Sequence, residues 1–183
     1  MDNLPKNLSR YQKTLAFDNG TGSKGIIPAT GKHALLLARA LSADHRREIA
    51  DAAGISPIDA IRMSMDASLE SYAFVPGGVM PVFMMGVEAT GRLTGGAMLW
   101  MLASDAIRGH APATVRAARW GLCRAFAVGG AERLEQYIPE WYATGLRFAR
   151  RLGFSIDPVP CRGRNGAALL HVVLERKEMP WGR

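Results

Sequence analysis

Cysteine is scarce in this chain: its 183 residues include only Cys123 and Cys161. Two cysteines so far apart cannot form a disulfide scaffold or a zinc site, and we expect both to be reduced thiols. The four histidines have no carboxylate partners at metal-ligand spacing, so the sequence predicts no metal centre. Disulfide-stabilised and zinc-dependent small proteins are therefore excluded.

Long hydrophobic runs are also missing. No apolar stretch approaches the roughly 20 residues that a membrane-spanning helix requires. The first residues lack the basic and then apolar pattern of a signal peptide, which predicts synthesis and retention in a cytoplasm. A hydrophobic content of 48% and a charged content of 21% are typical of one soluble globular domain.

Acidic residues are outnumbered, with 16 Asp and Glu against 23 Lys and Arg and a net charge of +7. A basic surface could bind a polyanion such as nucleic acid, the phosphates of CoA or an acidic protein face. It could equally be a solvated surface, because no block of five or more like charges occurs. Nucleic-acid binding therefore rests on net charge alone, without any recognition motif.

Residues 1–24 are polar and have no apolar periodicity, and the run from Asp18 to Ser23 is a turn or linker signal. We expect this segment to be an extended arm that binds another chain, or else to dock on its own domain. Residues 177–183 form a short tail in which Trp181 could anchor a partner contact or fold back onto the domain. The domain between them is expected to span residues 25–176.

Within this domain, apolar spacing predicts alternating helices and mainly antiparallel strands. Ser56 and Asp59 form a helix start with proline between them. The expected strands are 26–27, 72–75, 80–87, 97–103, 134–138, 154–157 and 168–174, and the expected helices are 32–41, 44–53, 56–69, 114–128 and 141–152. The pattern predicts an α+β (mixed α/β) fold.

The stretch from Leu146 to Asp157 is the most informative. Leu146, Ala149 and Leu152 recur at helical spacing, and Gly153 follows at a position typical of a helix C-terminus. Phe154 and Ile156 then alternate with polar residues, as in a short strand.

This helix, Gly-Phe and strand sequence resembles the end of the GNAT acetyltransferase fold. With the segments Met80–Val87 and Ala97–Ile107, it resembles more narrowly the GNAT-like internal virion or assembly proteins of tailed phages. The resemblance covers residues 25–176 and implies a central, mostly antiparallel twisted sheet flanked by helices.

The resemblance also implies where acetyl-CoA would bind. GNAT enzymes receive the pyrophosphate in a glycine-containing loop after the fourth strand, at a helix N-terminus. Here the matching segment is Arg108–Ala113, preceded by Ser104, and Arg108, Gly109, His110 and Ala111 are the candidate contacts. Ala111 replaces the central glycine, and Pro112 removes one N–H donor.

The resemblance to GNAT enzymes also implies which residues would be catalytic, and only some of them are present here. Active members carry a tyrosine in the last helix that protonates the departing thiolate, and Ala149 occupies that position here. Tyr142 could substitute only if its hydroxyl faced the cleft. Glu88, at the end of a predicted strand, is the candidate general base.

Two functions follow. The first is a structural or assembly component of a virion, made in the host cytoplasm, that requires no cofactor and binds other virion proteins through residues 1–24 and Trp181. The alternative is an active N-acetyltransferase that uses acetyl-CoA.

Overall fold

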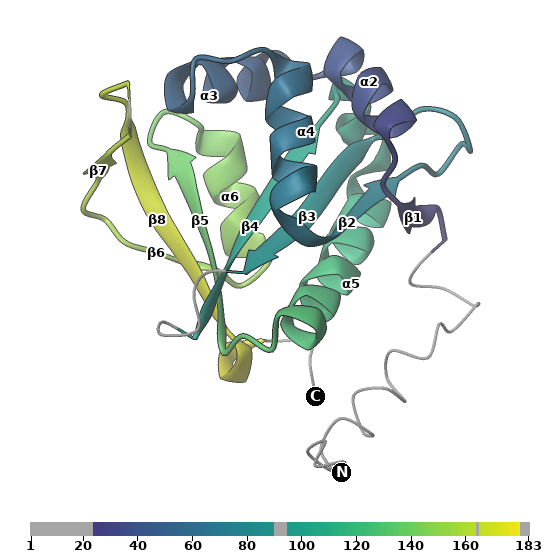
Figure 1. Cartoon of the computed structure of the whole chain (residues 1–183). Helices are drawn as coiled ribbons and strands as arrows, with labels where there is room; N and C mark the ends of the chain where they lie inside the picture. Colours follow the sequence, from purple (N-terminus) through teal and green to yellow (C-terminus); the bar gives the residue numbers. More distant parts are fainter. Residues whose placement is uncertain (1–23, 90–94, 164, 180–183) are drawn as a thin grey trace.

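An open eight-stranded sheet runs through the centre of the protein, with α-helices on both faces (Figure 1). The computed structural model describes residues 24–89, 95–163 and 165–179. The strands are β1 (Ile26–Pro28), β2 (Ser68–Phe74), β3 (Phe83–Ala89), β4 (Gly96–Ala103), β5 (Arg133–Pro139), β6 (Ser155–Ile156), β7 (Cys161–Arg162) and β8 (Ala168–Glu175). Their order is β1-β2-β3-β4-β5-β8-β6, with β7 also paired to β8. Among the described strands only β4 and β5 pair in parallel, which confirms the predicted mixed fold.

Three helices follow β1: α2 (Gly31–Ala40) and α4 (Pro57–Ala67), which cover one face of the sheet, and α3 (Ala43–Ala52), which crosses the top of the sheet in Figure 1. Each begins after a side-chain cap, supplied by Thr30, Ser42 and Ser56 in turn. The hydroxyl of Ser56 accepts a hydrogen bond from the N–H of Asp59, which satisfies an orphan donor of the first turn and confirms the predicted helix start.

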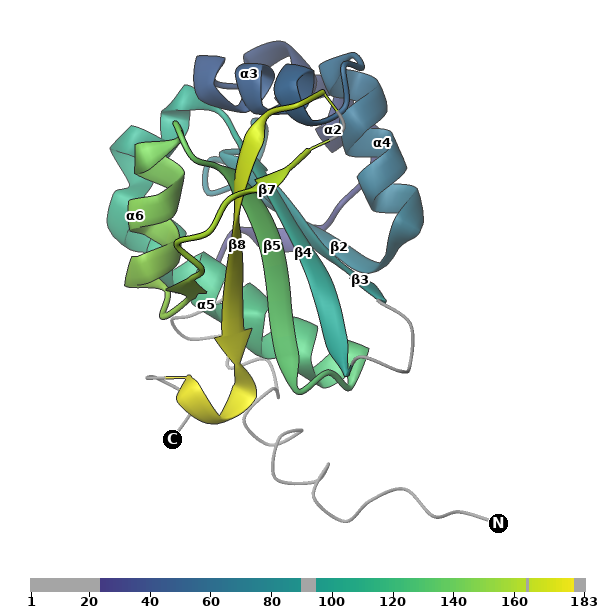
Figure 2. The same cartoon turned by 90° about the vertical axis from the view of Figure 1, so that its left-hand side faces the viewer.

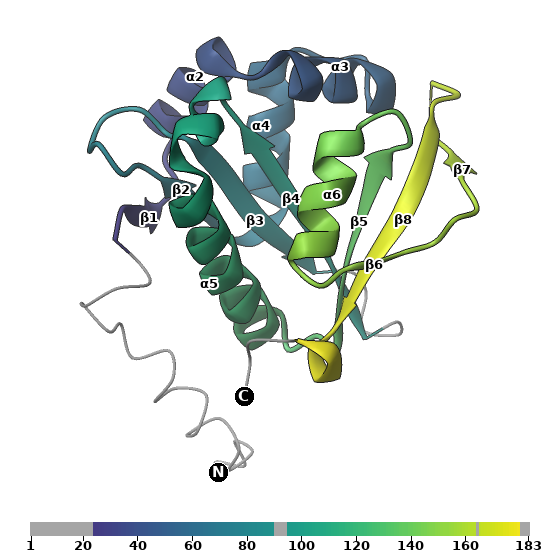
Figure 3. The ribbon, with the colours of Figure 1, turned by 180° about the vertical axis from the view of Figure 1, so that it is seen from behind.

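Two helices cover the opposite face, α5 (Ala111–Gly129) and α6 (Ala143–Arg151) (Figure 3). A bidentate ion pair links α5 to the sheet, because Arg124 donates from Nε to Glu70 Oε2 at 2.7 Å and from a terminal nitrogen to Oε1. Hydrogen bonding by Arg124 lowers the pKa of Glu70 despite its burial, so the pair stays ionised.

The central strand β4 is buried on both faces, as its continuous apolar sequence predicts. Leu99 packs in the cluster beneath α5 and α6, whereas Trp100 and Leu102 pack against α2, α3 and α4. The sheet thus separates two hydrophobic layers.

The junction after α6 has the predicted form. Gly153 adopts a φ of +89°, and its N–H and that of Phe154 bond back to Arg150 and Ala149 at 2.9 and 3.1 Å. Phe154 is 7% exposed and packs in the cluster with Leu146. Figure 2 shows the short β6 following α6 beside β8.

Several boundaries differ from the sequence-based expectations. The strand predicted from residue 72 begins at Ser68, and the strand predicted from Met80 begins at Phe83, which leaves Met80 exposed in the connection. Cys161 begins the short strand β7, which the sequence did not predict. Residues 1–23 and Trp181 lie outside the described residues, so the arm and tail remain predictions. No described helix is long and apolar enough to cross a membrane.

Candidate active site

β4 and β5 pair only along their first residues. The parallel register joins Gly96 to Arg133, Ala97 to Leu134 and Met98 to Glu135, although β4 continues to Ala103 and β5 to Pro139. Beyond this last rung the strands separate, as Figure 1 shows. Within the described residues these facing edges have no partner strand, although the carbonyl oxygen of Ala103 at the end of β4 accepts from the N–H of Ser42 at 3.0 Å. The backbone groups of β4 before Ala103 could therefore pair with an extended chain that carries amide groups.

A cavity of about 430 Å³ lies behind the separated strands, between α5 and α6. Most of its lining is apolar, and it includes Leu99 and Met101 of β4, Val115 and Leu122 of α5, and Phe148 and Ala149 of α6. Such a cavity suits a narrow, mainly apolar chain that can also bond to the edge of β4.

The mouth of this cavity is helical, not a glycine loop. Residues Asp105–His110 form the 3₁₀ helix η1, which leads directly into α5 at Ala111, so the predicted loop is wrong in form. Pro112 is compatible with this helix because it lies in the first turn of α5, where backbone N–H groups have no partner within the helix.

The predicted phosphate contacts are distributed unevenly. Arg108 and Ala111 line the cavity, and the Arg108 side chain is 83% exposed with a long contact of 3.7 Å to Asp105. Gly109 and His110 are exposed at the surface beside the mouth. Ser104 is buried, and its hydroxyl donates to the carbonyl oxygen of Val82 at 3.1 Å, so it connects β4 to the chain before β3.

Tyr142 reaches the cavity from the N-terminus of α6, while its ring also packs beside Trp141. Its hydroxyl lies 3.3 Å from His45 Nε2, and His45 Nδ1 lies 2.7 Å from Glu48. Burial, followed by the charges of Glu48, Asp44 and Asp105, raises the pKa of Tyr142, so the hydroxyl stays protonated and can donate.

The architecture matches many solved structures. No protein-family model and no curated protein matches the sequence. Mycobacterium smegmatis RimJ in complex with CoA-disulfide superimposes with a TM-score of 0.63 at 14% identity, covering 85% of this chain and 83% of that one. RimL, a ribosomal-protein α-N-acetyltransferase in complex with coenzyme A, gives 0.62 at 8% identity with 82% and 92% covered. A GCN5-related N-acetyltransferase from Brucella melitensis gives 0.62 at 15% identity with 85% and 76% covered.

The chain has the GNAT acetyltransferase fold. The identities are below the level at which a likeness carries activity, so this statement concerns architecture alone. The GNAT resemblance of the sequence is confirmed at this level. Its narrower likeness to phage proteins receives no support.

The residues around the cavity fit part of a coenzyme A molecule, the group bound in the RimL and RimJ structures. The apolar cavity and the unpaired edge of β4 suit an extended arm with amide groups. Thr114 Oγ1 is buried at the cavity and has no hydrogen-bonding partner among the described residues, so a polar ligand atom would satisfy it. The phosphate end is less complete, because Pro112 lacks an N–H and Asp105 and Glu48 bring negative charge to the mouth.

The predicted base lies on the other face of the sheet from the cavity. Glu88 is opposite Met98, whose partner on β5 is Glu135, so the three side chains share one rung and one face. Burial raises the pKa of Glu88, which favours a carboxyl group able to hold a proton. Its role as a base remains a prediction.

Two contributors to the site were not predicted. His45 is only 8% exposed, because α3 crosses the top of the sheet and brings this residue to Tyr142. Thr114 was not singled out. Neither residue carries a local sequence signal, since both acquire their role from contacts between distant segments. Among the described residues no cluster of His, Cys, Asp and Glu could hold a metal ion.

Proposed function

We propose that this protein is an acyltransferase that moves the acetyl group of acetyl-CoA to an amine. The observation that carries the proposal is the apolar cavity between α5 and α6, which lies along the unpaired edge of β4 and ends at the N-terminus of α5. The fold that it shares with CoA-bound RimL and RimJ supports this reading.

The chain's own residues supply binding and orientation. The β4 edge from Leu99 to Met101 would hold the extended arm of the cofactor by backbone hydrogen bonds, and Val115 and Phe148 would exclude water from it. At the mouth, the exposed Arg108 and the first amides of α5 would face the phosphates. Bound acetyl-CoA supplies an activated acetyl group as a thioester.

The geometry also orients the two ends of the cavity. If the phosphates lie at the N-terminus of α5, an arm running down β4 brings its reactive end toward the last rung, Met98 and Glu135. An acceptor would then approach from the opposite face, through the opening between the strands. Tyr142 lies at the phosphate end, where its protonated hydroxyl can donate a hydrogen bond.

The structural role in a virion, which the sequence favoured, receives no support from the fold or from the comparisons. The findings favour the enzymatic alternative instead. Association with other proteins through residues 1–24 remains a separate prediction.

The test is release of CoA from acetyl-CoA in the presence of two acceptor probes, a hexapeptide with a free α-amine and a blocked hexapeptide containing one lysine. We expect turnover by the wild type and its loss in Val115→Trp, whose indole would occupy the cavity. Val128→Trp is the matched control, because residue 128 lies near the other end of α5 and does not line the cavity. A wild type without turnover on either probe, or equal rates in all three proteins, would contradict the proposal.

A further inference from the structure

The face of the sheet opposite the cavity carries a histidine and a carboxylate that the account above does not use. His171 of β8 and Glu135 of β5 form a hydrogen bond of 2.9 Å between Nε2 and Oε2. From this pair we propose that His171 is the general base for the acceptor amine, with Glu135 as its positioning residue. The inference deepens the proposed function and rests on it.

Glu135 is held on several sides. Arg133 Nε donates to its Oε1 at 2.6 Å, and the same oxygen lies so close to the Cα of Gly96 that a Cβ there would collide with it. Its side chain is 12% exposed. Burial works against ionisation of Glu135, but the hydrogen bonds from His171 and Arg133 outweigh burial and lower its pKa, so it is a carboxylate.

A fixed carboxylate determines the tautomer of its histidine. Because Glu135 accepts from Nε2–H, the neutral imidazole keeps its lone pair on Nδ1. No described residue hydrogen-bonds to Nδ1, and the His171 side chain is 29% exposed. The Tyr137 ring stacks on the imidazole with a centroid distance of 4.8 Å and an interplanar angle of 19°, which fixes the ring plane. This is the arrangement of a base oriented by a third group.

The pair lies beside the opening between β4 and β5. The Glu135 carboxylate reaches both neighbouring strands, because one of its oxygens lies against Gly96 of β4 and the other bonds to His171 of β8. Glu135 belongs to the last paired rung, and Gln136, the next residue of β5, lines the cavity from the other face. Only one strand, about 4.8 Å from its neighbour, therefore separates His171 from the opening.

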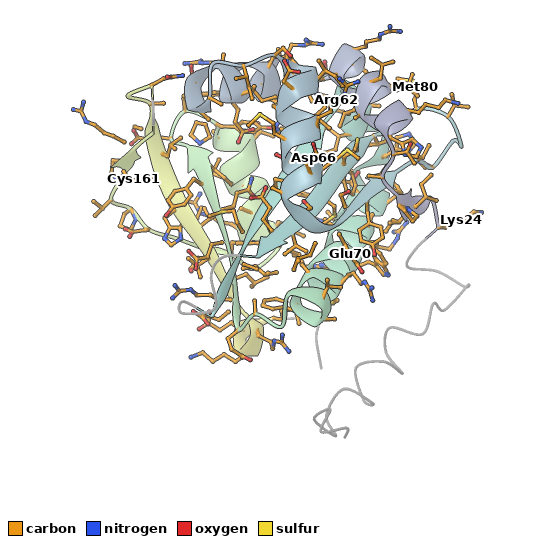
Figure 4. The ribbon with its side chains drawn as sticks, in the orientation of Figure 1. Lys24, Arg62, Asp66, Glu70, Met80 and Cys161 are labelled. Atoms are coloured by element: carbon orange, nitrogen blue, oxygen red, sulfur yellow. The ribbon has the colours of Figure 1, made fainter. Side chains whose placement is uncertain are left out.

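This face is open to a large acceptor. Figure 4 shows Arg62 and Asp66 on α4 at one side of it and Cys161 on β7 at the other, with β5 and β8 uncovered between them. The titratable and charged groups around His171 are Glu135, Arg133 and Tyr137 of β5 and Asp157 after β6, whose N–H donates to the His171 carbonyl oxygen.

The proton and bond changes balance. Neutral His171 takes one proton at Nδ1 from the acceptor ammonium group and becomes imidazolium. The amine lone pair then forms the C–N bond to the acetyl carbonyl carbon while the C–S bond breaks. The amine loses a second proton to the departing sulfur, and the amide keeps the third.

The experiment compares His171→Gln with the wild type for the two peptide acceptors across pH 6.5–9.5. We expect kcat/KM at pH 7 to fall by about 10²–10⁴, the usual contribution of a general base. We also expect the deficit to shrink at high pH, where a larger fraction of each acceptor is a free amine. His33→Gln on the exposed start of α2 is the matched control. In Glu135→Gln, kcat/KM should fall by a smaller factor than in His171→Gln, and the acidic limb of its pH profile should shift.

The tautomer of His171 can be measured without cofactor or acceptor, from the long-range ¹H–¹⁵N spectrum of the free protein. We expect His171 in the Nε2–H form, and a mixture of tautomers in Glu135→Gln. If the wild type is active but His171→Gln stays within threefold of it, or loses one constant factor at every pH, the inference fails while the proposed function stands. If His171 in the wild type carries its proton on Nδ1, the inference also fails. If the wild type turns over neither peptide, both fail together.

Discussion

Gly86 of β3 lies directly against the indole ring of Trp100 on β4. A Cβ at residue 86 would lie 2.6 Å from Nε1 and 2.8 Å from Cε2 of that ring, and 2.7 Å from Ser68 Oγ. Trp100 is itself held by a hydrogen bond of 2.8 Å from Nε1 to Ser68 Oγ, and it packs in the cluster beneath α2, α3 and α4. The absent side chain at residue 86 therefore leaves room for the indole ring on the face of the sheet that α4 covers.

Gly86→Ala should force the indole away from Ser68. Overpacking of this kind costs about 1–3 kcal/mol of unfolding free energy. Thermal and urea denaturation measure the loss, and tryptophan fluorescence reports the displaced ring. Gly31→Ala is the control, because a Cβ at that position meets nothing within 4 Å; an equal, small effect in both variants would show that the close contact is absent.

Phe154→Ala tests the junction after α6. The ring is 7% exposed inside the cluster that joins α5, α6 and the sheet, so its removal should cost about 3–5 kcal/mol. Urea denaturation measures this change. An unaltered midpoint would place the ring outside the core.

Glu88→Gln should stabilise the protein in a pH-dependent way. Burial raises the pKa of Glu88 in the folded state, so its stability contribution is fully present below the unfolded pKa and declines as pH rises through the folded value. The neutral glutamine avoids this loss. We expect a higher Tm than that of the wild type at pH 8 and a difference near zero at pH 4, with exposed Glu178→Gln as control. If the Tm difference instead grew as the pH fell, the pKa of Glu88 would be lowered in the folded state and not raised.

Pro112→Ala should strengthen acetyl-CoA binding by restoring one N–H in the first turn of α5. A single hydrogen bond contributes about 1 kcal/mol, or roughly a fivefold lower Kd. Isothermal titration of both proteins measures the ratio. An unchanged Kd would mean that the phosphates bind away from this turn.

The sequence predicted the parts of the fold that local patterns determine. The spacing from Leu146 to Phe154 encodes a helix, a glycine terminus and a buried ring within ten residues, and the apolar run of β4 encodes a central strand. It did not predict the start of β2, because α4 passes into Ser68 without a glycine or proline between them. The family resemblance implied a loop at Arg108–Ala113, but these residues belong to η1 and to the first turn of α5.

Residues of the candidate site could be predicted only where a single stretch of the sequence carries a recognisable motif. Arg108 and Tyr142 were named through the resemblance to GNAT enzymes, and both line the cavity. His45 meets Tyr142 across 97 positions of the chain, and His171 meets Glu135 across 36, so neither pair leaves a local pattern. Their roles depend on the crossing of α3 over the sheet and on the register of β5 with β8.

Isothermal titration of the full-length protein with acetyl-CoA tests most directly whether the cavity between α5 and α6 holds this cofactor. The incomplete phosphate end predicts one site with a Kd of about 10–100 µM, equivalent to about −7 to −5.5 kcal/mol. Val115→Trp should abolish the binding heat while Val128→Trp retains it. No heat from folded wild type at millimolar acetyl-CoA, or equal affinity in the Val115→Trp protein, would contradict the account.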